Sequence, residues 1–287
     1  MGALARACLG LAVFVTCLCT NAVTSAQELV RFESTPVRLG QLQQRLARER
    51  GEAPKAADTI EGYLAKPEGD GPFAAIVYLH GCDGLSKDTP KFVAQFVTGL
   101  GYASLSVDSF ATRGIEDACT KPMPALMLAR QGDALGALSY LSKLPFVDPQ
   151  RIAVLGASMG GMVALQLAST HHMETFDAPR DLKFKAAVAY YPWCGVASEE
   201  LIIPALILIG ELDDWTPARD CELWMKRRAD RGAPVKLLVY PGAYHAFNVP
   251  AFADGREMLG HWLKYDAKAA SSAVQEMQSF LAAQFSR

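Results

Sequence analysis

Short apolar runs alternate along the chain with longer amphipathic stretches. The runs occupy residues 73–79, 102–107, 151–155, 184–190, 205–209 and 235–240. Runs of this length that stop at glycine, proline or aspartate are typical of strands, and the most apolar of them predict strands buried on both faces of a sheet. Residues 59–65 alternate and end before Pro67, which predicts an edge strand.

The stretches between these runs have the spacing of amphipathic helices. They cover residues 91–100, 124–144, 160–169, 217–231 and 265–285, and a shorter one lies around 42–48. Alternating strands and helices predict an α/β fold, with a mostly parallel central sheet and helices on both faces. Ligands bind at the carboxyl ends of the strands in such sheets, so we expect functional residues there.

Composition and charge narrow the class of protein. The chain has 287 residues, of which 51% are hydrophobic and 20% are charged, as in ordinary globular proteins. The formal net charge is −2 and no basic stripe stands out, so we expect no nucleic-acid partner and no electrostatic binding to membranes. No two of the cysteines at 82, 119, 194 and 221 are spaced as Cys-x-x-Cys, so we expect no metal site.

The first 26 residues have the pattern of a secretory signal. Arg6 precedes an apolar run at residues 8–19, and small residues end at Ala26. The run is too short to span a bilayer, although a buried N-terminal helix is an alternative. We therefore expect a periplasmic or secreted protein, with an N-terminal extension at residues 27–58 and the main domain at 59–287.

A Gly-x-Ser-x-Gly pattern follows the predicted strand 151–155 and opens the next predicted helix. It comprises Gly156, Ser158 and Gly160, and the sharp turn needs the small flanking residues. This context predicts Ser158 as a nucleophile at a helix N-terminus, where the dipole favours negative charge. The alternative is a glycine-rich turn with an idle serine.

A nucleophilic serine needs a base and an orienting acid. In an α/β fold with this Gly-x-Ser-x-Gly turn, the acid comes after the serine along the chain, and the histidine comes after the acid. The loop at 210–217 holds Glu211, Asp213 and Asp214, of which Asp213 is favoured. Asp214 is the alternative, although Asp214 and Thr216 would also serve as caps of the next helix.

The base should be a histidine after that loop. His245 directly follows the strand at 235–240, whereas His261 falls in a helical stretch, and His171 and His172 come earlier in the chain. His245 is therefore the predicted general base.

An oxyanion needs backbone N–H donors. Met159, the residue after the nucleophile, and Cys82, in the loop after the strand at 73–79, are the candidates. A simple strand-ending turn is the alternative for that loop.

Five segments in this order resemble the dienelactone hydrolase family of the α/β-hydrolase superfamily. They read YLHGCDG, GYASLSVDSF, RIAVLGASMGG, LILIGELDDWTP and YPGAYHAF, and the resemblance covers residues 59–287. It implies the α/β-hydrolase fold, a small-molecule ester or lactone substrate and no cofactor. The type enzyme of that family has a cysteine nucleophile at the position of Ser158. It also has an arginine just after the catalytic histidine that binds the substrate carboxylate, whereas residues 246–249 of this chain contain no arginine.

Four cysteines remain in the predicted mature chain. Because their loops emerge on one edge of the sheet, Cys82–Cys119 and Cys194–Cys221 are the favoured pairs among the three possible pairings. Four buried thiols are the alternative.

Aromatic residues near the strand ends are candidates either for an apolar pocket or for the core. They are Tyr191, Trp193, Trp215 and Phe247. Arg113 and Arg130 would contact an anionic substrate or, as is more common, form structural pairs.

The sequence as a whole predicts a serine hydrolase that cleaves an ester or lactone through an acyl-enzyme. An amide or peptide hydrolase with the same triad, or a non-enzymatic binding protein on the same fold, are the alternatives. The sequence does not determine the oligomeric state.

Overall fold

The computed structural model describes residues 27–51, 57–120, 124–170, 174–179 and 181–286. The expected signal at residues 1–26 lies outside these ranges, as do His171 and His172. Within the ranges, no helix combines the length and the apolar character needed to cross a membrane.

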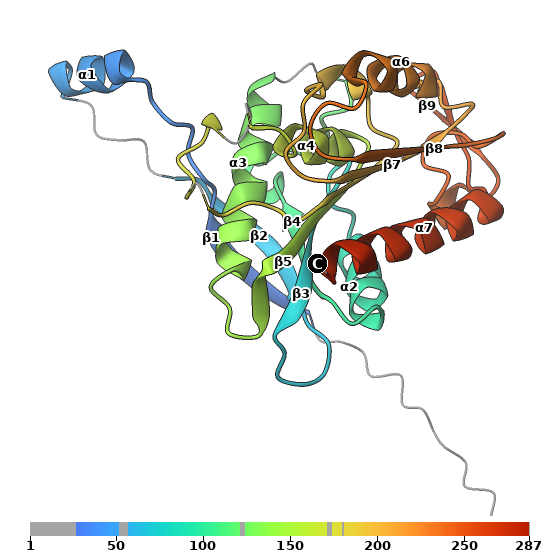
Figure 1. Cartoon of the computed structure of the whole chain (residues 1–287), viewed down its shortest axis with the longest axis horizontal. Coiled ribbons are helices and arrows are strands. Elements are labelled where there is room, and N and C mark those ends of the chain that lie inside the picture. The colour runs from blue at the N-terminus through green and yellow to red at the C-terminus, as the bar shows by residue number, and fades with distance from the viewer. Residues whose placement is uncertain (1–26, 52–56, 121–123, 171–173, 180, 287) are drawn as a thin grey trace, which may run out of the picture.

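An eight-stranded sheet forms the centre of the described chain (Figure 1). Its strands are β1 (Glu28–Glu33), β2 (Thr59–Ala65), β3 (Phe73–Leu79), β4 (Ala103–Asp108), β5 (Val147–Ala157), β6 (Ala187–Tyr190), β7 (Ala205–Gly210) and β8 (Val235–Tyr240). Their order is β1-β2-β4-β3-β5-β6-β7-β8. β2 is antiparallel to both neighbours, and the pairs from β4 to β8 are parallel. The expected mostly parallel sheet is therefore confirmed.

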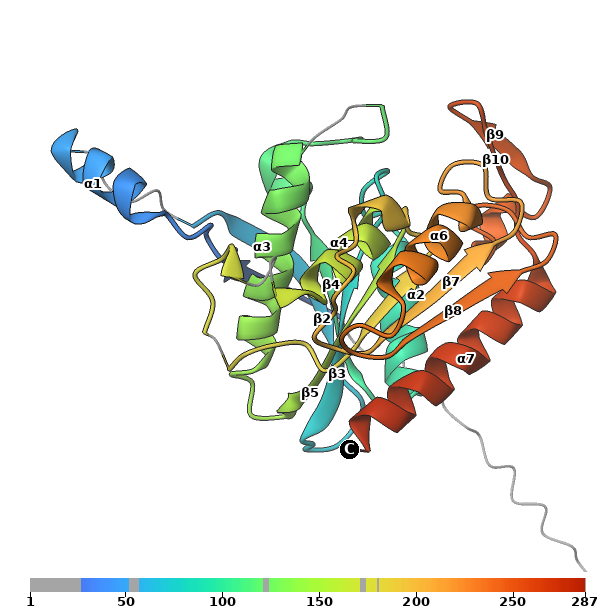
Figure 2. The ribbon, with the colours of Figure 1, turned by 45° about the horizontal axis from the view of Figure 1, so that its top comes forward.

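Helices cover both faces of this sheet. They are α1 (Gln41–Glu49), α2 (Thr89–Gly99), α3 (Pro124–Leu141), α4 (Met159–Leu167), α6 (Ala218–Arg228) and α7 (Ala267–Phe285). α3, α4 and α6 lie on one face and α2 and α7 on the other, while α1 extends away from the sheet (Figures 1 and 2). Because the central strands are covered twice, every residue of β6 and β7 is buried.

The edge of the sheet differs from the expectation. β2 was expected to be an edge strand, but β1 pairs along its whole length and is itself the edge. In β1, Val30 and Phe32 are buried while the other four residues are exposed. This alternation of buried and exposed residues is short and lies among charged residues, so the sequence pattern alone does not predict a strand here.

The segment that carries His261 is a hairpin, so its assignment to a helical stretch was wrong. β9 (Arg256–Met258) and β10 (His261–Leu263) pair antiparallel. Leu259 and Gly260 make the turn with φ of 54° and 83°. Leu263 also bridges to His245, so pairing with a neighbouring loop overrides the helical spacing of the apolar residues.

Candidate active site

Ser158 lies at the sharp turn between β5 and α4. Its φ of 53° and ψ of −117° fall in a region that residues other than glycine rarely occupy. Two segments of the backbone approach each other closely at this turn, since a Cβ on Gly156 would lie 2.2 Å from the carbonyl carbon of Gly160. The glycines of the sequence pattern are therefore needed for this close approach.

Three side chains from separate loops form one hydrogen-bonded chain. Ser158 Oγ lies 3.2 Å from His245 Nε2, and His245 Nδ1 lies 2.8 Å from Asp213 Oδ2. Ser158 follows β5, His245 follows β8 and Asp213 follows β7. The carboxyl ends of these parallel strands meet at one edge of the sheet. The side chains of Asp213 and His245 are only 0% and 4% exposed, so water competes little for their hydrogen bond.

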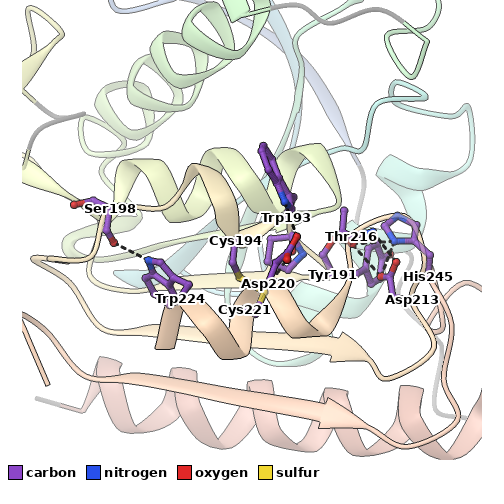
Figure 3. The surroundings of a disulfide bond; sticks show 11 residues. Tyr191, Trp193, Cys194, Ser198, Asp213, Thr216, Asp220, Cys221, Trp224 and His245 are labelled. Carbon is purple, nitrogen blue, oxygen red and sulfur yellow. Dashed lines mark hydrogen bonds and ion pairs between the residues drawn. A yellow bond between two sulfur atoms is a disulfide. The ribbon is translucent and has the colours of Figure 1, made fainter. Parts of the chain in front are cut away.

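The Asp213 carboxylate is held by its own loop. Oδ1 accepts hydrogen bonds from the backbone N–H of Trp215 and Thr216, at 3.0 and 2.8 Å. The Thr216 hydroxyl lies 3.0 Å from Asp213 Oδ2 and 3.0 Å from the carbonyl oxygen of Tyr191 (Figure 3). No sequence pattern indicated these contacts of Thr216. Its alternative role as a cap is wrong, because α6 has no side-chain cap.

The other two acids of the loop have different partners. Asp214 Oδ1 lies 3.5 Å from His261 Nδ1, and Glu211 accepts a hydrogen bond from the N–H of Gly242 at 2.9 Å. Of the three acids, it is therefore Asp213 that the structure brings to His245.

The loop after β3 lies beside the predicted nucleophile, Ser158. A Cβ on Gly81 would lie 3.8 Å from Ser158 Cβ. The next residue, Cys82, forms a disulfide with Cys119, and its carbonyl accepts the N–H of Ala118 at 2.8 Å. The segment at 114–120 is thereby tied to this loop. Met159, the other candidate donor, is the first residue of α4.

Two of the predicted pocket residues contact His245. The Tyr191 ring meets the His245 ring edge-on, with centroids 4.6 Å apart, and the Trp215 ring lies 5.3 Å from it. Tyr191 is buried, and its hydroxyl donates to Asn248 at 2.8 Å, a partner that no sequence pattern indicated. These rings pack around the imidazole and restrict its orientation.

The other two aromatic residues form no ring contact with His245 in the described part of the chain. Phe247 has no exposed surface and belongs to the core, while Trp193 is 42% exposed and donates to Asp220 at 2.9 Å. A disulfide between Cys194 and Cys221 lies beside this hydrogen bond and joins the segment after β6 to α6 (Figure 3). Both disulfides have the pairing that the sequence favoured.

A cleft of about 520 Å³ lies between the segment at 114–120 and the β9–β10 hairpin. It is lined by Gly114, Ile115, Glu116, Asp117, Thr120, Met258 and Leu259. One wall is tied to Cys82 by the disulfide, and the other is tied to His245 by the bridge from Leu263. Neither Ser158 nor His245 is among the residues that line this cleft, and the four predicted aromatic residues do not line it either.

The two arginines considered for substrate binding are engaged elsewhere. Arg113 binds both carboxylate oxygens of Asp133, at 2.7 and 2.9 Å, and lies 3.0 Å from an oxygen of Asp58. Arg130 is completely buried and donates a hydrogen bond to the carbonyl oxygen of His80. Both therefore have structural partners.

A mostly parallel sheet with serine at the turn after β5, and with acid and histidine after later strands, defines the α/β-hydrolase fold. The sequence model of the dienelactone hydrolase family matches residues 60–285. The chain belongs to the dienelactone hydrolase family.

Individual relatives with curated sequences share about 30% of their residues with this chain over the matched segments. Esterase FrsA of Klebsiella pneumoniae (strain 342) is 31% identical over 108 residues, which are 38% of this chain and 25% of FrsA. An uncharacterized protein of Mycobacterium tuberculosis (strain ATCC 25618 / H37Rv) is 30% identical over 205 residues, or 67% of this chain and 68% of its own length. The chain thus spans only a quarter of FrsA.

Solved structures share the fold. A dienelactone hydrolase-like promiscuous phosphotriesterase, P91, from metagenomic libraries has a TM-score of 0.64 at 20% identity, over 90% of this chain and 99% of its own. Propionate-bound esterase 2 of Thermogutta terrifontis has a TM-score of 0.58 at 18% identity, over 78% and 89%.

Proposed function

We propose that this protein is a serine hydrolase that cleaves carboxylic esters or lactones through an acyl-enzyme. The observation that carries the proposal is the hydrogen-bonded chain from Asp213 through His245 to Ser158. His245 Nε2 accepts the proton of the Ser158 hydroxyl as Oγ attacks the carbonyl carbon. Asp213 holds the Nδ1–H side of the ring and stabilises the imidazolium that forms.

The attack leaves a negative charge on the former carbonyl oxygen. The backbone N–H groups of Met159 and Cys82 are the proposed donors to it, and the N-terminus of α4 adds a favourable dipole. The intermediate collapses as His245 protonates the leaving alkoxide, and the acyl group stays on Ser158. Water, deprotonated by His245, then attacks the acyl-enzyme and releases the carboxylic acid.

We further propose that the substrate enters the cleft between the segment at 114–120 and the β9–β10 hairpin, whose lining favours small substrates without a negative charge. Ile115, Met258 and Leu259 provide apolar surface, while Glu116 and Asp117 would repel an anion. We expect a neutral ester to be cleaved at least about tenfold more efficiently than its carboxylate-bearing analogue, as measured by kcat/KM. Equal efficiencies would contradict this substrate preference.

We also propose that the protein works in an oxidising compartment outside the cytoplasm. The disulfides Cys82–Cys119 and Cys194–Cys221 support this location, since such bonds persist mainly in exported proteins. Fractionation of the native host, with detection of an N-terminus near residue 27, tests the export. Full-length protein in the cytoplasm would contradict it.

The test of the catalytic function compares the wild type with Ser158→Ala on an activated ester such as p-nitrophenyl acetate. We expect the variant to lose about 10⁴- to 10⁶-fold in kcat. An organophosphate triester should inactivate the wild type and add one phosphoryl group to Ser158, as located by peptide mass spectrometry. Undiminished turnover in the variant would contradict the proposal. An amide panel run alongside distinguishes ester from amide cleavage.

A further inference from the structure

Arg130 is a buried cation that the mechanism above does not use. It lies on α3, has no exposed surface, and donates through Nη2 to the carbonyl oxygen of His80. Asp133, one turn further along the helix, is bound by Arg113 instead. Burial lowers the pKa of Arg130 to about 10, which leaves the guanidinium protonated near neutral pH. Asp133 and Asp83 partly compensate its charge, but no carboxylate of the described residues forms a salt bridge with it. A buried charge of this kind is costly, so its position calls for an explanation.

The residue that Arg130 holds makes a second contact in the same loop. His80 Nδ1 lies 2.7 Å from the carbonyl oxygen of Gly81, and because a carbonyl only accepts, Nδ1 must carry the proton. Burial and the charge of Arg130 keep the pKa of His80 well below its ordinary value, so the ring is neutral. The Phe110 ring packs against both side chains, 4.5 Å from the imidazole and 5.4 Å from the guanidinium.

These contacts act on the peptide groups that precede the candidate oxyanion donor. The Gly81 carbonyl and the Cys82 N–H belong to one planar trans peptide and point in opposite directions. A hydrogen bond that fixes the carbonyl therefore also fixes the direction of the N–H. In the same way, Arg130 fixes the peptide one residue earlier through the His80 carbonyl.

The first turn of α4 confines that carbonyl from another side. A Cβ on Gly160 would lie 2.7 Å from the carbonyl oxygen of His80. The loop with the Cys82 N–H and the turn with the Met159 N–H are therefore in direct contact, and the His80 carbonyl lies where they meet.

We propose that Arg130 and His80 are positioning residues that hold the Gly81–Cys82 peptide with its N–H directed at the oxyanion. This inference rests on the proposed hydrolase function and assigns a supporting structure to the same site. Neither side chain touches the substrate. A donor oriented before the reaction costs no reorganisation when the negative charge develops, and a cation in a dry interior adds to its stabilisation.

The experiment compares Arg130→Met and Arg130→Lys with a matched control, Arg228→Met. Arg228 is also buried, lies 5.4 Å from the Trp224 ring, and donates to backbone carbonyls of the loop after α6. We expect Arg130→Met to lower kcat on p-nitrophenyl acetate by about ten- to a hundredfold while KM changes less than about threefold. Arg130→Lys should lose less, because it keeps a cation and a donor.

A second measurement separates positioning from general destabilisation. A trifluoromethyl ketone forms a tetrahedral oxyanion on serine, so its Ki should rise in Arg130→Met by the factor by which kcat/KM falls. His80→Gln should show the same proportionality. The control Arg228→Met should lower the melting temperature and leave both values near wild type. If Arg130→Met does not fold, Arg130→Lys and His80→Gln carry the comparison.

Two outcomes would overturn the inference while the proposed function stands. One is a kcat for folded Arg130 variants within about twofold of wild type, and the other is an equal loss in Arg228→Met. Loss of turnover in Ser158→Ala must accompany either result. A wild type without Ser158-dependent hydrolysis would instead overturn the proposed function, and this inference with it.

Discussion

Asp213 and Asp214 are consecutive residues, yet their carboxylates bind different histidines. Asp213 Oδ2 lies 2.8 Å from His245 Nδ1, whereas Asp214 Oδ1 lies 3.5 Å from His261 Nδ1. Trp215 contacts both imidazoles, with ring centroids 5.3 and 4.8 Å away. Two neighbouring acid–histidine pairs therefore share one tryptophan, and of the two it is the pair with Asp213 that reaches Ser158.

This arrangement predicts a large difference between two conservative variants. Asp213→Asn should lower kcat/KM by about 10⁴-fold, because the amide cannot stabilise the imidazolium and favours the wrong tautomer. Asp214→Asn should stay within about threefold of wild type. Steady-state hydrolysis of p-nitrophenyl acetate measures both, and the reverse ranking would assign the acid to position 214.

A methyl group at Gly160 should disturb the contact between α4 and the loop after β3. A Cβ there would lie 2.1 Å from the carbonyl oxygen of Leu79, so backbone must move. We expect Gly160→Ala to lower the free energy of unfolding by about 2 kcal/mol or more, and kcat with it. Urea unfolding measures this. Gly99→Ala, at a helical position with no atom within 4 Å of the added carbon, should be neutral or stabilising by up to about 1 kcal/mol.

The buried imidazole of His80 should make the protein less stable in acid. Its pKa is lowered in the folded state by burial and by Arg130, while the unfolded chain titrates near 6.5. The unfolded state therefore binds more protons below that pH, and stability falls as pH decreases. His80→Gln should reduce the loss between pH 7 and 5 by up to about 2 kcal/mol. Denaturant unfolding at both pH values tests this, with His261→Gln as the control for a more exposed histidine.

The two disulfides should stabilise the fold by similar amounts but differ in their effect on catalysis. Replacing either pair by serine should cost about 2–4 kcal/mol, since the bonds close loops with separations of 37 and 27 residues. Cys82→Ser with Cys119→Ser should also lower kcat, because Cys82 carries the candidate oxyanion donor. Melting curves and kinetics compare the pairs. Alkylation of all four thiols without reduction would contradict both bonds.

Most of the central strands were predictable because each combines an apolar run with a local stop signal. β8 has the bounds expected, and β5 and β6 differ only in length. β1 was missed because Val30 and Phe32 are too few to distinguish a strand within a charged segment. The hairpin at His261 was mistaken for helix because its apolar spacing suits both, and only the bridge from Leu263 to His245 decides between them.

The sequence by itself was enough to predict a site made of Ser158, an acid in the loop at 210–217 and His245, since the glycine pattern and the strand ends are local properties of the chain. The tertiary structure decided which acid faces His245, that Phe247 belongs to the core, and that Arg130 donates a hydrogen bond to the His80 carbonyl in the loop after β3. These facts depend on the directions of side chains that meet across elements far apart in sequence. Such directions are set by packing, which no local pattern encodes.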